Sequence, residues 1–448
     1  MILLPVISLI LIFCFYQKRN RYRFGIVNLI ILTYLVMGCV ALILELSGKS
    51  KSVFPINFEP MTYLSISFFI IFWGFIGFRD QKFTTIKIEN MYFYRVLETF
   101  LLIGGLLAIL FFLPFAYAGL AGDVDLNRFT IQYLGGSKLG SFGIVNSFFT
   151  LLANLFILNQ VCSFINFIPR NGRRNVFKAY LLLISSFSYV VYIFAYVGRD
   201  GVVFWLMSYL FCYLLFRDFL ARDDLKKLKL FFTLTLTVLL IPFCIITIAR
   251  FSILEGGVGW WVLNYGGQQL KNFNDHYLIL ESLAYGRLGF PVFVDFFELV
   301  TFSEVQALDN AAMFAHFYNN NVFPFVFTTF IGFIMLDFGK IWTLFYLCIF
   351  SLFVRSTLKK VSTKGILNFS TLLILTLLYQ VVYWGVFYFK QYATNYYVIF
   401  ILLLFASFKV SHMKRFSAHF FKVNTTQLLR PRNMTWLNKV LRQIVQKL

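Results

Sequence analysis

The feature that most constrains this chain is a series of continuous apolar stretches, most of them about 15 to 25 residues long, separated by charged segments. A membrane-spanning helix needs about 20 predominantly apolar residues. Hydrophobic residues make up 60% of the chain and charged residues 13%, whereas soluble domains have about 45–50% and about 25%. The strands of a membrane β-barrel would instead alternate apolar and polar residues. The pattern therefore predicts an all-α polytopic integral membrane protein.

Eleven apolar stretches are predicted to form transmembrane helices, at 1–16, 24–46, 61–78, 96–118, 141–168, 179–197, 201–216, 230–249, 338–354, 366–388 and 394–408. The stretch 322–337 is apolar too. We interpret it as re-entrant or interfacial, because a twelfth crossing would reverse the orientation of everything after it. The chain then divides into a first bundle of eight helices (1–249), a large loop (250–337), three C-terminal helices (338–408) and a basic tail (409–448).

The net charge of +21 is distributed unevenly between the two sides of this predicted bundle. Six segments on one side carry 30 of the 40 Lys and Arg residues: 17–23, 79–95, 169–178, 217–229, 355–364 and 409–448. Basic residues mark cytoplasmic loops. The N-terminus and the large loop are thus expected outside and the C-terminus in the cytoplasm. The positive charge is explained by this topology, and we expect no nucleic-acid partner.

Four arginines lie on the predicted outer side, against the general trend: Arg128, Arg199, Arg250 and Arg287. Arg199 stands in a tight turn between two helices, where flanking glycines permit close backbone approach. Asp200 is an alternative, purely structural, ion-pair partner for it. Arginine holds two phosphate oxygens at once and is permanently charged. Arginines converging on one outer site would therefore bind a phosphate or pyrophosphate group.

The large loop is rich in aromatic and amide residues, among them Trp260, Trp261 and Tyr265. Such residues suit either a membrane interface or the faces of sugar rings, and the sequence leaves both open.

His276 and His316 are candidate general bases in the same loop, because imidazole titrates near neutral pH; the alternative is that they are inert. Asp123 and Asp125 form a short DxD pair that is a weak candidate for metal binding. We otherwise expect no metal and no cofactor.

Three local patterns carry a resemblance to a known family. The first is the turn Val197-Gly-Arg-Asp-Gly201. The second is the beginning of the large loop, with Arg250, Glu255 and Asn264-Tyr-Gly-Gly-Gln-Gln-Leu-Lys-Asn-Phe273. The third is the end of that loop, with Asn319-Asn-Asn-Val-Phe-Pro324 and Leu336-Asp-Phe-Gly-Lys340. With the helix plan, these patterns resemble the bacterial oligosaccharide repeat-unit polymerases, the Wzy-type O-antigen and capsule polymerases.

Some members of that family have a glycine eleven residues after an outer-loop arginine. This chain departs from that pattern, with Trp261 after Arg250 and Leu139 after Arg128.

The resemblance implies a GT-C-like helical bundle in the bacterial cytoplasmic (inner) membrane. It implies a glycosyltransferase-type polymerase of cell-envelope polysaccharide, lipopolysaccharide or capsule, whose substrate is an undecaprenyl-pyrophosphate-linked oligosaccharide. Arg199, Arg250 and Arg287 would bind the pyrophosphate, with Arg128 and Asp200 nearby. A loop histidine or carboxylate would deprotonate the acceptor hydroxyl, and the aromatics would hold sugars. Membrane lipids, a chain-length regulator and a flippase are the implied partners.

Two alternatives remain at this point. An O-antigen ligase would share the outer loop and the arginines, so the helix plan does not separate it from a polymerase. A lipid-linked oligosaccharide flippase would be expected to carry charges inside its helices and to show repeated halves. In this sequence the polar residues concentrate on the outer side, and no internal repeat is visible.

Overall fold

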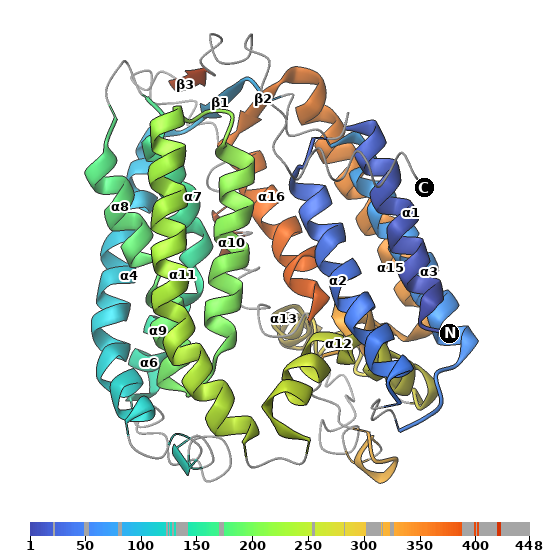
Figure 1. Ribbon diagram of the computed structural model, residues 1–448. Coiled ribbons are helices and arrows are strands. Elements are labelled where there is room, and N and C mark those ends of the chain that lie inside the picture. The colour runs from blue at the N-terminus through green and yellow to red at the C-terminus, as the bar shows by residue number, and fades with distance from the viewer. Residues whose placement is uncertain are drawn as a thin grey trace.

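The computed structural model describes residues 1–20, 23–48, 53–78, 83–121, 124, 126–127, 130, 142–169, 174–252, 256–281, 283–301, 315, 317–322, 327–387, 398–399, 401–402 and 419–422. Helices make up nearly all of the regular structure in these ranges, and a single small sheet lies at one end (Figure 1). The first half of the chain contains α1 (Leu3–Arg19), α2 (Ile26–Leu46), α3 (Phe58–Gly74), β1 (Thr85–Ile88), α4 (Met91–Leu120), α6 (Gly143–Asn154), α7 (Phe156–Phe167), α8 (Val176–Ser185), α9 (Ser188–Ala195) and α10 (Asp200–Phe216). The second half contains α11 (Arg222–Phe251), α12 (Gly257–Leu278), α13 (Pro291–Thr301), α15 (Thr329–Lys364), β2 (Ile366–Asn368), α16 (Phe369–Val382) and β3 (His419–Lys422).

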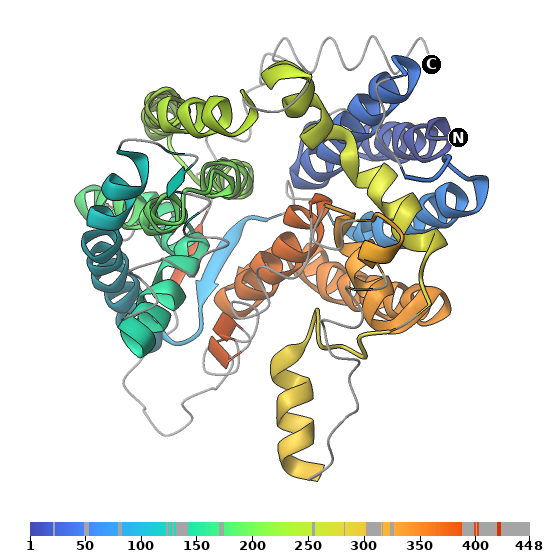
Figure 2. The ribbon, with the colours of Figure 1, turned by 90° about the horizontal axis from the view of Figure 1, so that it is seen from below.

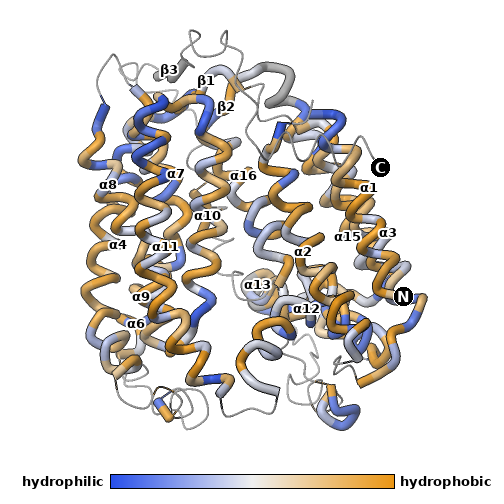
Figure 3. The backbone as a smooth tube through the Cα atoms, viewed as in Figure 1, coloured by the Kyte–Doolittle hydropathy of each residue, from blue (hydrophilic) through white to orange (hydrophobic). Residues whose placement is uncertain are grey.

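Seven helices in the described ranges are long and apolar enough to cross a membrane, and the bent pair α6–α7 would make an eighth. The apolar α10 is shorter, at 17 residues, and α1 has the same length. Hydrophobic residues make up most of the length of the helices, and hydrophilic residues gather toward the ends of the molecule (Figure 3). In α11, exposed residues such as Leu234, Val238 and Ile241 face outward. The chain is therefore an all-α, multi-pass membrane protein, as its apolar stretches predict.

Some helices differ from their predicted bounds, one of them by a break and another by an earlier start. The predicted helix 141–168 is broken at Leu155, where α6 and α7 meet at 42°. The amide of Asn154 donates to the Thr150 carbonyl at 2.8 Å, a local side-chain bond of the kind that bends helices. The helix α11 begins at Arg222, eight residues before its predicted start. The apolar pattern missed these first turns because they are rich in charged residues. The predicted helix 394–408 lies mostly outside the described residues.

One end of the molecule is closed by a sheet whose strands come from distant parts of the chain. The central strand β1 pairs in parallel with β2, Thr85 opposite Ile366, and antiparallel with β3, Thr85 opposite Lys422. Figure 1 shows this sheet at the top of the helices. The basic segments 79–95 and 409–448 therefore meet at this end, together with the strand that directly follows the basic segment 355–364.

Ion pairs connect the remaining basic segments at this end. Arg23 pairs with Asp218 at 2.5 Å, and Arg174 pairs with Asp224 at 2.6 Å. Lys178 pairs with the buried Glu98, near the start of α4. The segments 17–23 and 169–178 are thus each joined by an ion pair to 217–229, and 169–178 is also joined to the start of α4.

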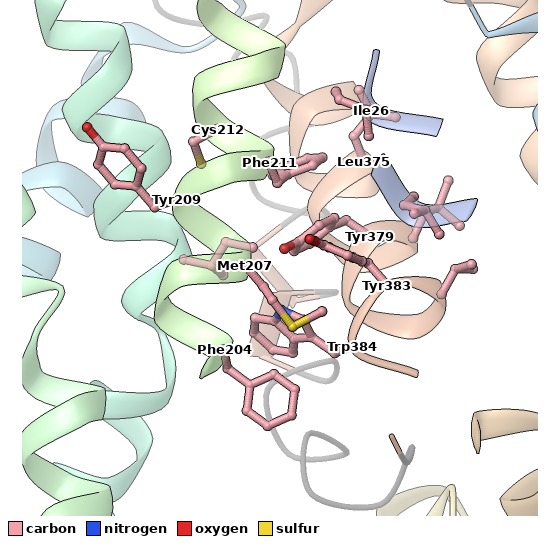
Figure 4. Close-up of a cluster of buried hydrophobic side chains, with 14 of the residues drawn as sticks. Ile26, Phe204, Met207, Tyr209, Phe211, Cys212, Leu375, Tyr379, Tyr383 and Trp384 are labelled. Atoms are coloured by element: carbon pink, nitrogen blue, oxygen red, sulfur yellow. The ribbon is translucent and has the colours of Figure 1, made fainter. Parts of the chain in front are cut away.

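Aromatic side chains fill the interior between α16, α10 and α7. The rings of Phe211 on α10 and Tyr379 on α16 stack with centroids 4.0 Å apart, and Figure 4 shows Tyr383 and Trp384 beside them. Trp384 stacks in turn on Phe156 of α7, at 5.6 Å. Rigid ring contacts of this kind fix how α16 sits against both neighbours.

At the opposite end, the region predicted as a large loop contains a 22-residue helix. This helix, α12, crosses the bottom of the bundle (Figures 1 and 2) and packs against α2. Gly267 makes the approach possible, since a Cβ there would lie 2.7 Å from the Ala41 backbone.

The ambiguous stretch 322–337 overlaps the first part of α15. Gly339 interrupts that helix with φ 78° and ψ 177°. The ten helical residues 329–338 rise about 15 Å, half of the hydrocarbon thickness of about 30 Å. Phe330, Ile331 and Ile334 are fully buried in them. This half-length piece packs against protein rather than lipid, which a re-entrant interpretation requires.

Candidate functional site

Arg199 lies in a tight turn between α9 and α10, at the end of the bundle away from the sheet. Val197 has a positive φ of 53°, and Arg199 itself is the N-cap of α10. The turn folds over Ile193, because a Cβ on Gly198 or Gly201 would lie 2.7 or 2.8 Å from atoms of that side chain. Both glycines are therefore needed for the close approach, as the sequence predicts.

The side chain of Arg199 is half-buried among residues of two other helices. Its Nη1 donates to the Thr247 hydroxyl at 3.0 Å. Its guanidinium carbon lies 4.4 Å from the ring centroid of Phe251 on α11 and 4.7 Å from that of Tyr265 on α12. Cation–π contacts at these distances hold a guanidinium in a fixed place.

Arg250 reaches the same two rings from the last turn of α11. Its guanidinium carbon lies 4.9 Å from the Tyr265 centroid and 5.5 Å from the Phe251 centroid. The two guanidinium carbons are therefore at most about 9.6 Å apart, which is the sum of their distances to the Tyr265 centroid. We call Arg199 and Arg250 the arginine pair. The structure brings together these two sequence-predicted residues with Tyr265, also predicted from the sequence.

The electrostatics of the arginine pair favour an anion beside it. Two unit charges no more than about 9.6 Å apart repel by at least about 2 kcal/mol at an effective dielectric of about 20, a value suited to sites near a protein surface. Both side chains are half-buried, which weakens solvent screening. A phosphate or pyrophosphate presents several oxygens to such a pair and offsets the repulsion.

Aromatic residues continue from the arginine pair along α12. Trp261 stacks on Phe251 with centroids 5.7 Å apart, and Trp260 meets Trp261 edge to face at 4.6 Å. Tyr265 also contacts Phe327, ahead of α15, at 5.7 Å. The three predicted aromatics, Trp260, Trp261 and Tyr265, therefore form one wall next to the guanidinium groups.

Two contributors to this site were missed by sequence reasoning. Thr247 and Phe251 lie on α11, three residues before and one residue after Arg250. Thr247 is a polar residue inside an apolar helix, one turn from Arg250, and this pattern would have predicted a place in the same site. Phe251 gave none, because phenylalanine is abundant throughout the chain, with 60 residues.

His276 is placed away from the arginine pair, on the last part of α12. It is fully buried and meets Phe317 edge to face at 4.9 Å. Eleven helical residues separate it from Tyr265, a rise of about 16 Å.

The neighbours of His276 anchor the segment before α3. Asp275 accepts from the backbone N–H groups of Val53 and Phe54 at 3.1 and 3.3 Å. Tyr277 donates to Glu59 at 2.6 Å. Burial, and then the Glu59 carboxylate, raises the pKa of Tyr277. This end of α12 therefore serves as a scaffold.

Arg287 is also placed apart from the arginine pair. It pairs with Glu298 on α13. The turn that carries it is tied to α15 through Asp337, whose two carboxylate oxygens accept from the N–H groups of Leu288 and Gly289 at 3.0 and 2.7 Å. The sequence predicts that Arg287 shares a site with Arg199 and Arg250, whereas in the structure it forms an ion pair with Glu298.

The remaining predicted residues fall into two groups. Asp200 begins α10 beside Arg199, with its Oδ1 3.2 Å from the Cβ position at Gly198. Arg128, His316, Asp123 and Asp125 lie outside the described residues. Within the described ranges, no three His, Cys, Asp or Glu side chains gather into a group that could hold a metal ion.

Comparison with known proteins found no matching family model, no matching curated protein and no matching solved structure.

Proposed function

We propose that this chain is a polymerase of undecaprenyl-pyrophosphate-linked oligosaccharide repeat units, acting at the outer face of the bacterial cytoplasmic membrane. The observation that carries the proposal is the arginine pair, with Arg199 and Arg250 both resting on Tyr265. Two guanidinium groups no more than about 9.6 Å apart suit a pyrophosphate, whose two phosphoryl groups each accept charged hydrogen bonds. The resemblance to the repeat-unit polymerases supplies the substrate class.

The proposed reaction is a glycosyl transfer with a lipid pyrophosphate as leaving group. A hydroxyl at the non-reducing end of the acceptor unit attacks the anomeric carbon of the donor chain. The bond from that carbon to the pyrophosphate oxygen breaks, and the hydroxyl proton passes to a base. The arginine pair would stabilise the charge that develops on the leaving pyrophosphate. His276 is left out of this mechanism, because it is buried and about 16 Å along the helix from Tyr265.

The aromatic wall would hold the sugars next to the bond that breaks. Tyr265 contacts the arginine pair directly, and Trp261 stacks on Phe251, which contacts the same two guanidinium groups. Aromatic faces suit the apolar faces of sugar rings. Trp260 extends this wall away from the guanidinium groups.

For the membrane topology we propose eleven crossings, with the N-terminus outside, the C-terminus in the cytoplasm and the region 250–337 outside. The gathering of basic segments at one end, through the sheet and three ion pairs, supports this arrangement, since positive residues mark the cytoplasmic side. The arginine pair lies at the other end, where a lipid-linked substrate on the outer leaflet would present its pyrophosphate.

The deciding experiment separates surface polysaccharide and lipid-linked intermediates on a gel, from a deletion strain that expresses variants. Arg199→Ala and Arg250→Ala are expected to replace the polymer ladder with a single-repeat band. Arg287→Gln is the matched outer-side control and is expected to keep the ladder. Intact polymer that remains on its lipid carrier would identify a ligase instead, and unchanged glycans in the deletion strain would reject both enzymes.

A binding measurement on purified protein separates ligand binding from folding. Inorganic pyrophosphate is expected to raise the Tm of the wild-type protein in detergent, because a ligand of the folded state stabilises it by mass action. The rise should disappear in Arg199→Ala and Arg250→Ala and persist in Arg287→Gln. An equal rise in all four proteins would place the pyrophosphate elsewhere.

A further inference from the structure

A second site lies on the outer surface of α4, far from the arginine pair. It is an open groove of about 680 Å³ between α4 and α6. Both helices lie at the edge of the bundle in the two ribbon views (Figures 1 and 2). Nearly all of its lining is apolar, and Phe148 and Leu152 of α6 form one wall. A Cβ at Gly104 would lie 2.9 Å from Leu152, so this glycine lets the wall lie close to α4.

The polar part of the groove is confined to one end. Tyr92 and Arg95 lie in the first two turns of α4, directly after β1 and so at the end of the bundle that carries the basic segments. From Tyr92 the groove continues to Leu107, fifteen residues along the helix and about 22 Å. One leaflet contributes about 15 Å of hydrocarbon, half of about 30 Å. The groove is therefore long enough for an acyl chain with a headgroup at the Arg95 end.

Arg95 differs from the three ion-paired basic residues at this end in its surroundings. Arg23, Arg174 and Lys178 each pair with a carboxylate at this end. Arg95 is exposed, and among the described residues it has no carboxylate within ion-pair distance. A cation next to an apolar, lipid-facing groove is complementary to an anionic phospholipid.

We propose that the groove along α4 binds an anionic membrane phospholipid, with its phosphate headgroup on Arg95 and Tyr92 and an acyl chain along Gly104 and Leu152. This lipid is separate from any lipid-linked substrate of the arginine pair, because its headgroup end at Tyr92 and Arg95 lies at the end of the bundle with the sheet, whereas the arginine pair lies at the other end. The preference is for the negative headgroup: a basic residue at a membrane surface adds about fivefold to the binding of an anionic lipid.

Lipid retention in native mass spectrometry tests the headgroup contact. The full chain is purified in a nonionic detergent and incubated with equal amounts of phosphatidylglycerol and phosphatidylcholine. Wild-type protein is expected to retain phosphatidylglycerol about fivefold over phosphatidylcholine. Arg95→Gln should lose this preference, and Arg222→Gln, which changes an exposed arginine of α11 outside the groove, should keep it. Equal retention of both lipids by wild type, or an unchanged preference in Arg95→Gln, would overturn the proposal.

A second pair of variants tests the groove itself. Ile103 lines the groove and is 53% exposed, whereas Leu110 on the same helix is 66% exposed and is not part of the lining. Ile103→Trp is expected to reduce the retention of both lipids, because the indole fills the groove. Leu110→Trp adds the same bulk outside it and should retain lipid as wild type does. Equal retention by the two tryptophan variants would reject the groove as the binding site.

Discussion

Arg199 and Arg250 meet at Tyr265, one of the two aromatic rings that both contact: their guanidinium carbons lie 4.7 and 4.9 Å from its centroid. The two arginines lie at opposite ends of the helical pair α10–α11, with Arg199 directly before α10 and Arg250 in the last turn of α11. The ring comes from a third helix, α12. Tyr265, which carries no charge itself, therefore helps to position both charges, together with Phe251.

Replacing that ring should affect polymer synthesis through the arginine pair. Tyr265→Phe keeps the aromatic face and is expected to preserve the ladder of surface polysaccharide. Tyr265→Ala removes two cation–π contacts, each worth about 0.5–2 kcal/mol, and is expected to shorten or abolish the ladder. The measurement is the gel of surface polysaccharide in the complemented deletion strain. Equal ladders from the phenylalanine and alanine variants would show that the ring does not position the arginines.

The ion pair of Arg23 with Asp218 should stabilise the fold at the basic end. The pair connects the segment before α2 to the segment before α11, and both side chains are mostly buried. Asp218→Asn is expected to lower the free energy of unfolding by about 1–3 kcal/mol, because it leaves the guanidinium without its charged acceptor.

A double-mutant cycle measures this contribution. It compares the thermal unfolding of Arg23→Gln, Asp218→Asn and the double variant in detergent. A double variant about as stable as the worse single variant would confirm the coupling, and strictly additive losses would contradict it.

Gly339 is expected to be intolerant of a side chain. Its φ of 78° with ψ of 177° lies in a region that essentially only glycine adopts. Gly339→Ala should lower the free energy of unfolding by about 1–3 kcal/mol. Gly259→Ala is the matched control, since its Cβ would meet no atom within 4 Å and it lies inside α12. That variant should be about 0.5–1 kcal/mol more stable than wild type. Comparable thermal unfolding of the two variants would remove the special role of Gly339.

Lys271 gives the protein a predicted pH dependence. It is 2% exposed on α12, and burial lowers its pKa, while Glu45 and Asp275 act in the opposite direction. The unfolded chain therefore binds this proton more tightly than the folded chain. Stability should rise with pH from the lowered pKa of the folded state up to about 10.4, the ordinary value of a lysine.

The test compares Lys271→Met with wild type. Below the lowered pKa, the variant should be the more stable protein, and its advantage should shrink as the pH rises toward about 10. Lys226→Met replaces an exposed lysine, whose side chain is 83% accessible, and should show no such trend. Thermal unfolding across the pH series measures both. A constant difference between Lys271→Met and wild type would show that the lysine does not titrate differently on folding.

The sequence alone determined the fold class, the apolar helices and the tight turn at Arg199. An apolar stretch such as 24–46 must satisfy its backbone hydrogen bonds internally once it is in lipid, and the structure has α2 at Ile26–Leu46. The glycines around Arg199 predicted a tight turn with close backbone approach, and in the structure both glycines lie against Ile193. These inferences rest on local chemistry, which the sequence carries directly.

Only the tertiary structure decided which residues meet. Thr247 and Tyr265 lie 48 and 66 positions after Arg199 in the sequence, yet both contact it. It also buried His276 and gave Arg287 a separate ion pair with Glu298. The physical reason is that lipid is as apolar as a protein core, so a hydrophobic residue that faces a neighbouring helix looks the same in the sequence as one that faces the membrane. Helix neighbours are therefore set by shape, ring stacking and a few polar contacts.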